Sequence, residues 1–360
     1  MLNEYLDQPL LSIVVPVYNG GESFRRCLDS LVLWAKDAEI IVVSDGESDG
    51  SWRLAERYGA KVIRLPVSKG PANARNVGAQ AASSEIILFI DADVEIHQNT
   101  VEQVRHEFDD TSVAALIGSY DDAPGASNFL SQYKNLFHHY THQQGREEAS
   151  TFWGACGAIR RDIFLKVGGF DDSYRRPCIE DIELGYRLKR LGYRIRLCKA
   201  IHVKHLKHWT PYSLLRAEVF YRALPWMALL LRLRQSHPNQ YKQFSSDLNL
   251  KWSSRLSVVL VYVLVLCLLL LTLLLSVSSV SLSFISSSLV TVALLWTILL
   301  CTVALIATNF PLYKFFYRKR GAPFALCVVP WHWLYYLYSG MAFVVGTLRH
   351  YLQNFRRSAV

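Results

Sequence analysis

Two long stretches without charge in the last third of the chain constrain its fold most. Residues 256–313 contain no Asp, Glu, Lys, Arg or His, and residues 321–348 contain only His332 of these types. A helix of about 20 apolar residues spans a bilayer. Three segments fit, at 256–275, 289–308 and 323–346. We therefore predict a transmembrane region over residues 255–348, after a globular part.

Basic residues lie beside these apolar segments. The net charge is +9, from 39 Lys and Arg against 30 Asp and Glu. Anionic lipid headgroups attract cations at the ends of membrane helices, and the chain carries no nucleic-acid motif, so we predict a membrane partner and no nucleic acid. The clustered residues are Arg232, Arg234, Lys242, Lys251, Arg255, Lys314, Arg318, Lys319, Arg320, Arg349, Arg356 and Arg357.

The orientation follows from the charges and the N-terminus. The first ten residues lack the basic start and apolar run of a signal peptide, and the loop after the second segment is basic, as cytoplasmic loops are. We therefore predict a multi-pass protein of the inner (plasma) membrane with a cytoplasmic globular domain. Three full spans would place the basic tail at 349–360 outside, whereas a re-entrant third segment would not. Both remain open.

Strands and helices alternate along the globular part. This alternation predicts a mainly parallel sheet with helices on both faces, and ligands bind beyond the carboxyl ends of such strands. The seven Cys show no paired spacing in the sequence, which argues against a disulfide framework or a zinc site. We expect strands at 10–17, 39–43, 61–65, 85–90 and 193–203 and an extended segment at 151–160. We expect helices at 22–34, 51–58, 73–82, 127–143 and 180–191.

Residues 210–234 are aromatic, Leu-rich and contain several Arg. This composition suits a helix in the membrane interface, although a core helix of the globular domain is the alternative. Pro225 should kink either one, because proline cannot donate a helical hydrogen bond.

Two acidic residues, Asp91 and Asp93, follow the strand at 85–90. Mg²⁺ and Mn²⁺ bind to few protein carboxylates and complete their shell with water and phosphate oxygens. Such an ion would neutralise a diphosphate leaving group. Taken alone, the same pattern is common in solvated turns.

A small-residue segment at 69–78 begins a helix. Helix N-termini favour anions, so Lys69 and Arg75 are candidates for phosphate contacts. An ordinary helix entry packed tightly on the sheet explains the segment equally well. Tyr18 and Asp45 at strand ends suit a nucleobase, yet turns alone also favour Asn-Gly and Asp-Gly.

Glu180 and Asp181 begin the helix at 180–191. Acidic residues are favoured there by the helix dipole alone. In a functional interpretation, Asp181 is a general base that deprotonates an acceptor hydroxyl.

Six motifs in this order resemble the family-2 glycosyltransferases of the GT-A fold, over residues 10–205. The resemblance implies an α/β fold, with a Rossmann-like, mainly parallel sheet, in a catalytic domain at 1–208. Interfacial helices at 209–254 would lead to the transmembrane region. The motifs are Ser12-Ile-Val-Val-Pro-Val-Tyr-Asn19, Ser44-Asp45-Gly46, Gly70 to Gly78, Asp91-Ala-Asp93, Gly168-Gly-Phe-Asp171 and Glu180-Asp181.

The resemblance also implies roles for individual residues. Binding of the nucleotide sugar would fall to Pro16, Tyr18, Asn19, Asp45, Lys69, Arg75 and Asp91. Asp93, with Asp91, would hold Mg²⁺ or Mn²⁺. Asp181 would be the base with Glu180 beside it, and residues 153–157 would line the cleft. The acceptor would attack the anomeric carbon from the side opposite the nucleotide, which inverts the configuration.

The sequence departs from the family pattern twice. Ser44 stands where an Asp is common, and the Gln-x-x-Arg-Trp motif of processive synthases is absent. Instead, His202, His205 and His208 follow the last strand. Headgroup contacts are the favoured interpretation of these histidines, with the metal or the phosphates as the alternative.

These features predict transfer of one sugar, from a UDP-sugar by resemblance, to a hydroxyl of a membrane lipid or lipid-linked saccharide. A polyprenyl phosphate acceptor is the main rival, and it needs no base. A non-catalytic membrane scaffold with the same fold is the third possibility.

Overall fold

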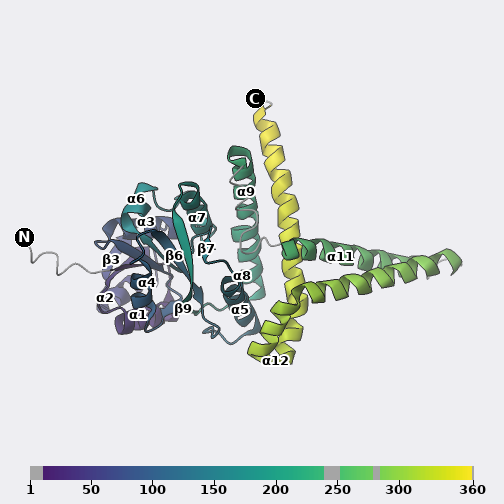
Figure 1. Cartoon of the computed structure of the whole chain (residues 1–360), viewed down its shortest axis with the longest axis horizontal. Helices are drawn as coiled ribbons and strands as arrows, with labels where there is room; N and C mark the ends of the chain where they lie inside the picture. Colours follow the sequence, from purple (N-terminus) through teal and green to yellow (C-terminus); the bar gives the residue numbers. More distant parts are fainter. Residues whose placement is uncertain (1–10, 239–251, 279–283, 359–360) are drawn as a thin grey trace, which may run out of the picture. The chain divides into compact units, whose positions relative to one another are not determined.

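The computed structural model describes residues 11–238, 252–278 and 284–358. The chain divides into two compact units, residues 1–244 and residues 245–360. The first, which we call the catalytic unit, contains a sheet and its helices, and the second, the apolar unit, contains long helices (Figure 1).

The sheet of the catalytic unit has the strand order β3-β2-β1-β4-β8-β6-β9-β5, and β7 pairs with β9. The part from β3 to β4 is parallel, as predicted. Beyond β4 the sheet is mixed, because β8 runs antiparallel to both β4 and β6. The strands are β1 (Ser12–Val17), β2 (Glu39–Asp45), β3 (Lys61–Leu65), β4 (Ile86–Ile90), β5 (Val94–Ile96), β6 (Val113–Tyr120), β7 (Glu148–Ala149), β8 (Cys156–Arg160) and β9 (Arg194–His205).

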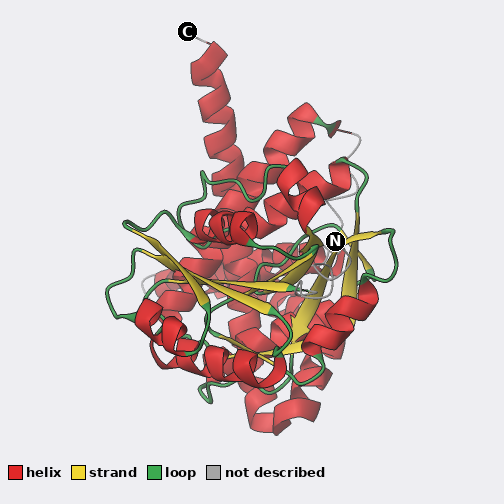
Figure 2. Cartoon of the chain, turned by 90° about the vertical axis from the view of Figure 1, so that its left-hand side faces the viewer, coloured by secondary structure: helices red, strands yellow, loops and turns green. Residues whose placement is uncertain are grey.

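Helices pack against this sheet (Figure 2). In α1, the side chains of Phe24, Leu28 and Leu31 recur at helical spacing and are buried. The prediction missed β5, α4, β6, β7 and α6. The helices are α1 (Gly21–Trp34), α2 (Ser51–Arg57), α3 (Pro71–Ala81), α4 (Thr100–Glu107), α5 (Phe129–Gln143), α6 (Arg161–Lys166) and α7 (Glu180–Arg190).

Small residues let α3 lie close to β1 and β2. Ala74 and Ala79 are fully buried, and a side chain at Gly78 would collide with Val14. The helix begins at Pro71, a residue favoured in the first turn of a helix. Tight packing on the sheet therefore accounts for part of the small-residue motif.

The segment after the sheet is helical, as predicted, but its geometry changes along its length. It comprises α8 (Pro211–Arg216), a π-helix η1 (Ala217–Ala223) and α9 (Leu224–Ser236). Pro225 is the second residue of α9, two residues after the end of η1. The proline ring crowds the preceding turn and removes one donor, and the wider π turn accommodates both effects.

The apolar unit consists of α11 (Trp252–Ser278) and α12 (Phe284–Ser358). Residues 252–276 and 289–352 are long and apolar enough to cross a membrane. Gly321 has a non-helical backbone (φ 82°, ψ 178°) and divides α12 into two segments. Residues 314–320, expected to form a loop, are helical up to this break, which is consistent with the good helix propensity of Lys and Arg.

Candidate active site

The carboxyl ends of β3, β2, β1 and β4 share one edge of the sheet, because these strands are parallel neighbours. Asn19 follows β1, Asp45 ends β2, and Asp91 follows β4. Ligands of open α/β sheets bind at this edge. The sequence-predicted residues at strand ends therefore lie along one row.

Asp45 is 3% exposed and holds the loop that leads into α3. One of its carboxylate oxygens accepts a hydrogen bond from the N–H of Lys69 at 2.8 Å. The other accepts from Ser68 Oγ at 2.8 Å and from the N–H of Gly70 at 2.9 Å. Gly70 has φ 94°, a backbone conformation that would be strained for any residue with a side chain. Asp45 thus shapes the loop that places Lys69, a role that its sequence context did not predict.

A pocket of about 330 Å³ opens at the ends of β2 and β3. The Arg64 guanidinium lies 3.8 Å from the centroid of the Trp52 ring. Glu47 accepts from the N–H groups of Gly50 at 2.8 Å and Trp52 at 3.0 Å. Sequence reasoning missed this pocket, for which Trp52 was the available signal. It is lined by Ser44, Gly46, Glu47, Trp52, Arg64, Leu65 and Pro66.

The residues expected around the base lie at the end of β1. Tyr18 is 59% exposed, and Pro16 is partly buried. Asn19 adopts a left-handed backbone (φ 51°), and its Oδ1 accepts from the N–H of Ser48 at 2.9 Å. Asn19 therefore connects the turn after β1 with the loop after β2.

Arg75 on α3 is the centre of a buried ionic triad. It is 5% exposed, and it donates to Asp91 Oδ1 at 2.6 Å and to Glu180 Oε1 at 2.9 Å. Burial opposes the positive charge, yet the two carboxylates raise the pKa of Arg75 above its ordinary value. Arg75 thus joins Asp91, after β4, to the start of α7.

Asp181 lies beside this triad. Its Oδ2 accepts from the N–H of Gly154 at 3.2 Å, so the predicted cleft segment at 153–157 contacts the predicted base. Burial and the neighbouring Glu180 raise the pKa of Asp181 to about 6. The carboxylate oxygens of Glu180 are bound by Arg75 and by the N–H of Cys178 at 2.8 Å. Asp181 is therefore the better placed base.

Asp93 lies next to the end of β9. The N–H of Leu206 donates to the Asp93 carbonyl at 2.8 Å, which brings His205 Nε2 and Lys207 Nζ to 3.8 and 3.6 Å from Asp93 Oδ2. Burial raises the pKa of Asp93, but the neighbouring side chains of His205 and Lys207 outweigh it and lower the pKa overall. His205, for which headgroup contacts were favoured from the sequence, lies inside the site instead.

Within the described parts of the chain, no three or more His, Cys, Asp or Glu residues form a group able to hold a metal. Asp93 and His205 offer one oxygen and one nitrogen donor, and Asp91 has a second oxygen beside the one bound to Arg75. Mg²⁺ and Mn²⁺ accept such donors and take further ligands from phosphate and water. The residues present therefore fit a divalent ion that binds together with a diphosphate.

Aromatic rings and imidazoles form a cluster between Asp93 and Asp181, which we call the aromatic box. Tyr120 lies 4.3 Å from the His205 ring and 4.7 Å from the Trp153 ring, between centroids. His138 lies 4.6 Å from Trp153, and His142 packs against His138 at 4.0 Å. Burial lowers the pKa of both α5 histidines, that of His142 to about 4, so the box is uncharged at neutral pH.

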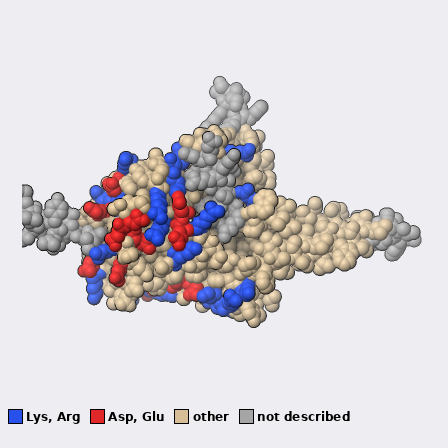
Figure 3. Space-filling model, viewed as in Figure 1, with Lys and Arg blue, Asp and Glu red and all other residues tan. Residues whose placement is uncertain are grey.

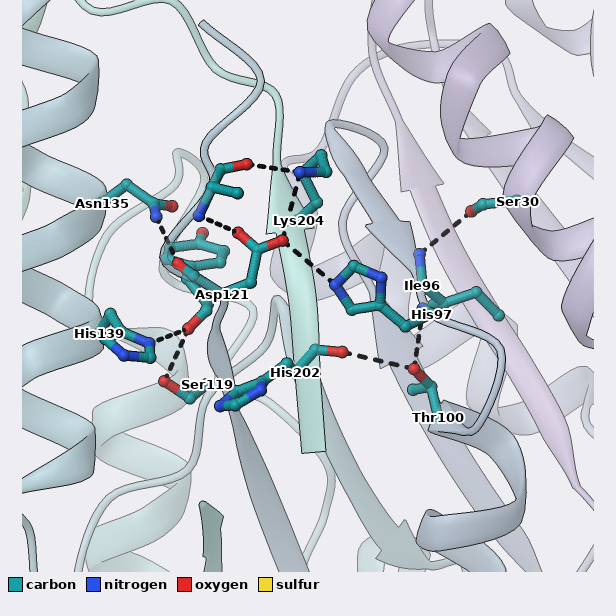
Figure 4. A network of polar contacts seen from close by, with 12 residues as sticks. Ser30, Ile96, His97, Thr100, Ser119, Asp121, Asn135, His139, His202 and Lys204 are labelled. Atoms are coloured by element: carbon teal, nitrogen blue, oxygen red, sulfur yellow. Dashed lines mark hydrogen bonds and ion pairs between the residues drawn. The ribbon is translucent and has the colours of Figure 1, made fainter. Parts of the chain in front are cut away.

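Asp121 holds the strands that support this site (Figure 4). Its Oδ2 lies 3.2 Å from His97 Nε2 and 3.3 Å from Lys204 Nζ, and its carbonyl accepts from Asn135 Nδ2 at 2.7 Å. These contacts join β6, the segment after β5, α5 and β9. The network keeps His205, which ends β9, beside Asp93.

The sequence of the catalytic unit matches models of known protein families. Residues 12–168 match the family model "Glycosyl transferase family 2". This part of the chain belongs to glycosyltransferase family 2. Residues 134–209 also match the model "N-terminal domain of galactosyltransferase". With the family match, the mixed α/β sheet confirms the predicted GT-A fold.

Curated proteins similar to this chain are named as glycosyltransferases. The pre-mycofactocin glycosyltransferase of Mycobacterium tuberculosis is 30% identical over 217 residues, which cover 55% of this chain and 44% of that protein. The probable glycosyltransferase YdaM of Bacillus subtilis is 30% identical over 215 residues, which cover 53% of this chain and 49% of that protein. The chain thus spans about half the length of these relatives.

Two solved structures illustrate the likeness. S. aureus TarS 1–349 in complex with UDP-GlcNAc is 19% identical with a TM-score of 0.47, covering 63% of this chain and 67% of that one. Mannosyltransferase PcManGT from Pyrobaculum calidifontis, in complex with GDP-Man and Mn²⁺, is 15% identical with a TM-score of 0.47. The match covers 94% of this chain and 87% of that one.

Proposed function

We propose that the chain is an inverting glycosyltransferase. It transfers one sugar from a nucleoside diphosphate sugar, a UDP-sugar, to a hydroxyl of a membrane lipid or lipid-linked saccharide. The observation that carries the proposal is the triad in which Arg75 binds both Asp91 and Glu180. It joins the residue expected on the donor to the pair that contains the base.

The row of strand ends suits a nucleoside diphosphate. The pocket at β2 and β3 lies at one end of the row, and Asp91 follows β4 at the other. Strands are about 4.8 Å apart, so the row from β3 to β4 extends over about 14 Å, which is comparable with an extended nucleoside diphosphate. In this arrangement Tyr18 covers the base from the end of β1, and Lys69 contacts the diphosphate.

Asp93 would hold the divalent ion, with Asp91 and His205 as the neighbouring donors. When bound, Mg²⁺ or Mn²⁺ supplies charge neutralisation for the departing diphosphate. The chain itself contributes Lys207, 3.6 Å from Asp93, as a further positive charge beside the leaving group. Both features favour departure of a nucleoside diphosphate.

Asp181 would take the proton from the acceptor hydroxyl. Because the pKa of Asp181 is raised only to about 6, the carboxylate is ionised at neutral pH and is still basic enough to act. It adjoins Glu180, which Arg75 joins to Asp91. Attack from the side opposite the nucleotide gives inversion.

The apolar unit would anchor the enzyme in the inner membrane, with the catalytic unit in the cytoplasm. Residues 252–276 and 289–352 have the length and composition of membrane helices. Tyr212 on α8 and Phe220 on η1 are 72% and 61% exposed, which suits contact with the membrane interface. Such an anchor keeps the cleft near a lipid acceptor.

The test is turnover by the purified full-length protein in lipid. A panel of nucleotide sugars is offered with Mg²⁺ or Mn²⁺, host lipid extract supplies acceptors, and parallel reactions contain a chelator. We expect metal-dependent consumption of one donor and a glycosylated lipid product. If no donor is consumed in any metal-replete reaction, the proposal fails and the scaffold alternative gains support.

A further inference from the structure

The π-helix η1 is held between the two helices that flank the aromatic box. Glu218 on η1 binds Lys134 Nζ of α5 at 2.6 Å, and both side chains are buried. Trp226, two turns further on, donates from its indole N–H to the Tyr186 hydroxyl of α7 at 2.9 Å. Arg222 lies midway between these two contacts, and residues four apart share one helix face. Arg222 is therefore directed toward the space between α5 and α7.

Arg222 is close enough to the reaction site to act on its charges. Its Nη1 lies 3.9 Å from Glu218 Oε1, and its side chain is 39% exposed. After burial and Glu180, its charge is one of the influences on the pKa of Asp181, which it lowers. It also contributes, after burial, to the lowered pKa of His138. Arg222 thus belongs to the same cleft as the base and the aromatic box.

Two cationic side chains lie beside Glu218. Lys134 and Arg222 converge on the single carboxylate of Glu218, so these three side chains carry a net charge of +1. Glu218 is also the only acidic residue among residues 210–236, against four arginines. An arginine in a partly dehydrated cleft favours phosphate, because its planar fork donates two parallel hydrogen bonds.

We propose that Arg222 binds a phosphate or diphosphate group of the lipid acceptor, next to the atom that attacks the sugar. The inference rests on the proposed function and deepens it, because it names the acceptor as a saccharide joined through phosphate or diphosphate to a long-chain alcohol. Such a lipid approaches from the membrane, and α8, η1 and α9 precede the apolar unit in the sequence. The aromatic box then lies between the phosphate site and the metal side of the cleft.

Binding tests this inference without any need for turnover. The full-length protein in detergent micelles is titrated with farnesyl phosphate, farnesyl diphosphate and farnesol, which share the same chain. We expect a phosphorylated form to bind about 10–100-fold more tightly than farnesol, as a charge-assisted pair would give. The preferred form shows whether the linkage between saccharide and lipid is a monophosphate or a diphosphate.

Variants assign the preference to one side chain. Arg222→Ala should abolish it, and Arg222→Lys should retain part of it, because charge remains without the fork. Arg216→Ala is the matched control: Arg216 lies in the preceding turns, packed over Tyr212 and Tyr221, and its loss should leave the preference intact. Thermal unfolding checks that each variant is folded. If Arg222→Ala does not fold, Arg222→Gln, which keeps the polar stem, replaces it.

Three results would overturn the inference. The wild-type protein could bind farnesol as tightly as both phosphorylated forms, or the preference could survive in a folded variant without an arginine or lysine at 222. Equal competition by phosphatidylglycerol would show general headgroup attraction instead. These outcomes are separate from failure of the proposed function, which is judged by consumption of nucleotide sugar.

Discussion

The two units of the chain bury polar groups in different ways. The catalytic unit buries charge, in the triad of Arg75, Asp91 and Glu180. The apolar unit buries neutral groups: Asn309 donates to Ser257 Oγ at 3.0 Å, and its Oδ1 accepts from the Tyr336 hydroxyl at 2.6 Å. On the face shown in Figure 3, charged residues gather on the catalytic unit, whereas residues 256–313 of the apolar unit contain no charged side chain.

The difference shows what each network is for. A buried ion pair rarely adds net stability, because desolvation offsets the attraction, so the triad is best explained by the positions it imposes on Asp91 and the start of α7. Neutral hydrogen bonds between apolar helices contribute modest stability and define how the helices pair. Charge is buried where chemistry needs it, and neutral groups serve where only packing is required.

The largest effect should come from Asp181→Asn, which removes the base and little else. Asn can still accept from the Gly154 N–H that binds Asp181, so the fold should be kept. General base catalysis contributes about 10²–10⁴-fold, and transfer to a hydroxyl should fall by that factor in a radiolabelled-sugar assay. Only a weak loss would indicate a phosphate as the attacking group, since a phosphate is already ionised.

Arg75→Met should cost the catalytic unit about 3–5 kcal/mol, because it leaves a buried carboxylate without its partner. Glu180 is 4% exposed, so water cannot replace the guanidinium. The double variant Arg75→Met with Glu180→Gln should recover much of this stability, but not the transfer activity. Thermal unfolding of the full chain measures the stability of both variants, and the radiolabelled-sugar assay measures their transfer activity. An unfolding temperature of Arg75→Met equal to that of the wild-type protein would mean that the triad is not a buried charge network.

The pH dependence should separate the activity of Asp181 from its effect on stability. Since burial and Glu180 raise its pKa to about 6, transfer should fall about tenfold for each pH unit below 6 and level off above it. Stability changes in the opposite sense. The raised pKa means that the protonated form is favoured in the fold, so its stabilising contribution is lost as pH rises through 6.

Asp181→Asn removes this ionisation. As pH rises from 5 to 8, the free energy of unfolding of the variant should therefore increase relative to that of the wild-type protein, by about 1 kcal/mol once solvent screening is allowed for. Unfolding temperatures at the two pH values measure the gain. A difference between variant and wild type that does not change with pH would contradict the raised pKa.

How much of this could be predicted from the sequence differs between the units. Alternating strands and helices, and the acidic residues after strands, follow from local periodicity, so β1 to β4 and the strand-end positions were predictable. The pairing of Asp93 with His205 was not, because it depends on β5 and β9 becoming antiparallel neighbours 111 residues apart. The same limit applies to Arg75, whose sequence suggests a phosphate contact while its tertiary neighbours are two carboxylates.

In the apolar unit, the absence of charge predicted the helices but not their contacts. His332 stood out in the sequence as an isolated polar residue, yet its Nε2 lies 3.1 Å from the Tyr336 hydroxyl, which in turn donates to Asn309. Nothing in local periodicity reveals that partner, since Asn309 lies on the other side of the break at Gly321.

The smallest effect should come from Asn309→Leu in this neutral network. It removes the link between Ser257 on α11 and Tyr336 on the last segment of α12, and such hydrogen bonds are worth about 0.6–1.7 kcal/mol in membrane helices. The variant should unfold at a lower concentration of denaturing detergent, as followed by the circular dichroism signal of the helices. Turnover of nucleotide sugar should stay unchanged. Thr297→Val is the matched control, because the exposed Thr297 hydroxyl bonds only the Ala293 carbonyl of its own helix at 2.8 Å and should cost nothing. Equal losses in the two variants would mean that the buried network adds nothing beyond local helix stability, and the contrast between charged and neutral burial would then rest on the catalytic unit alone.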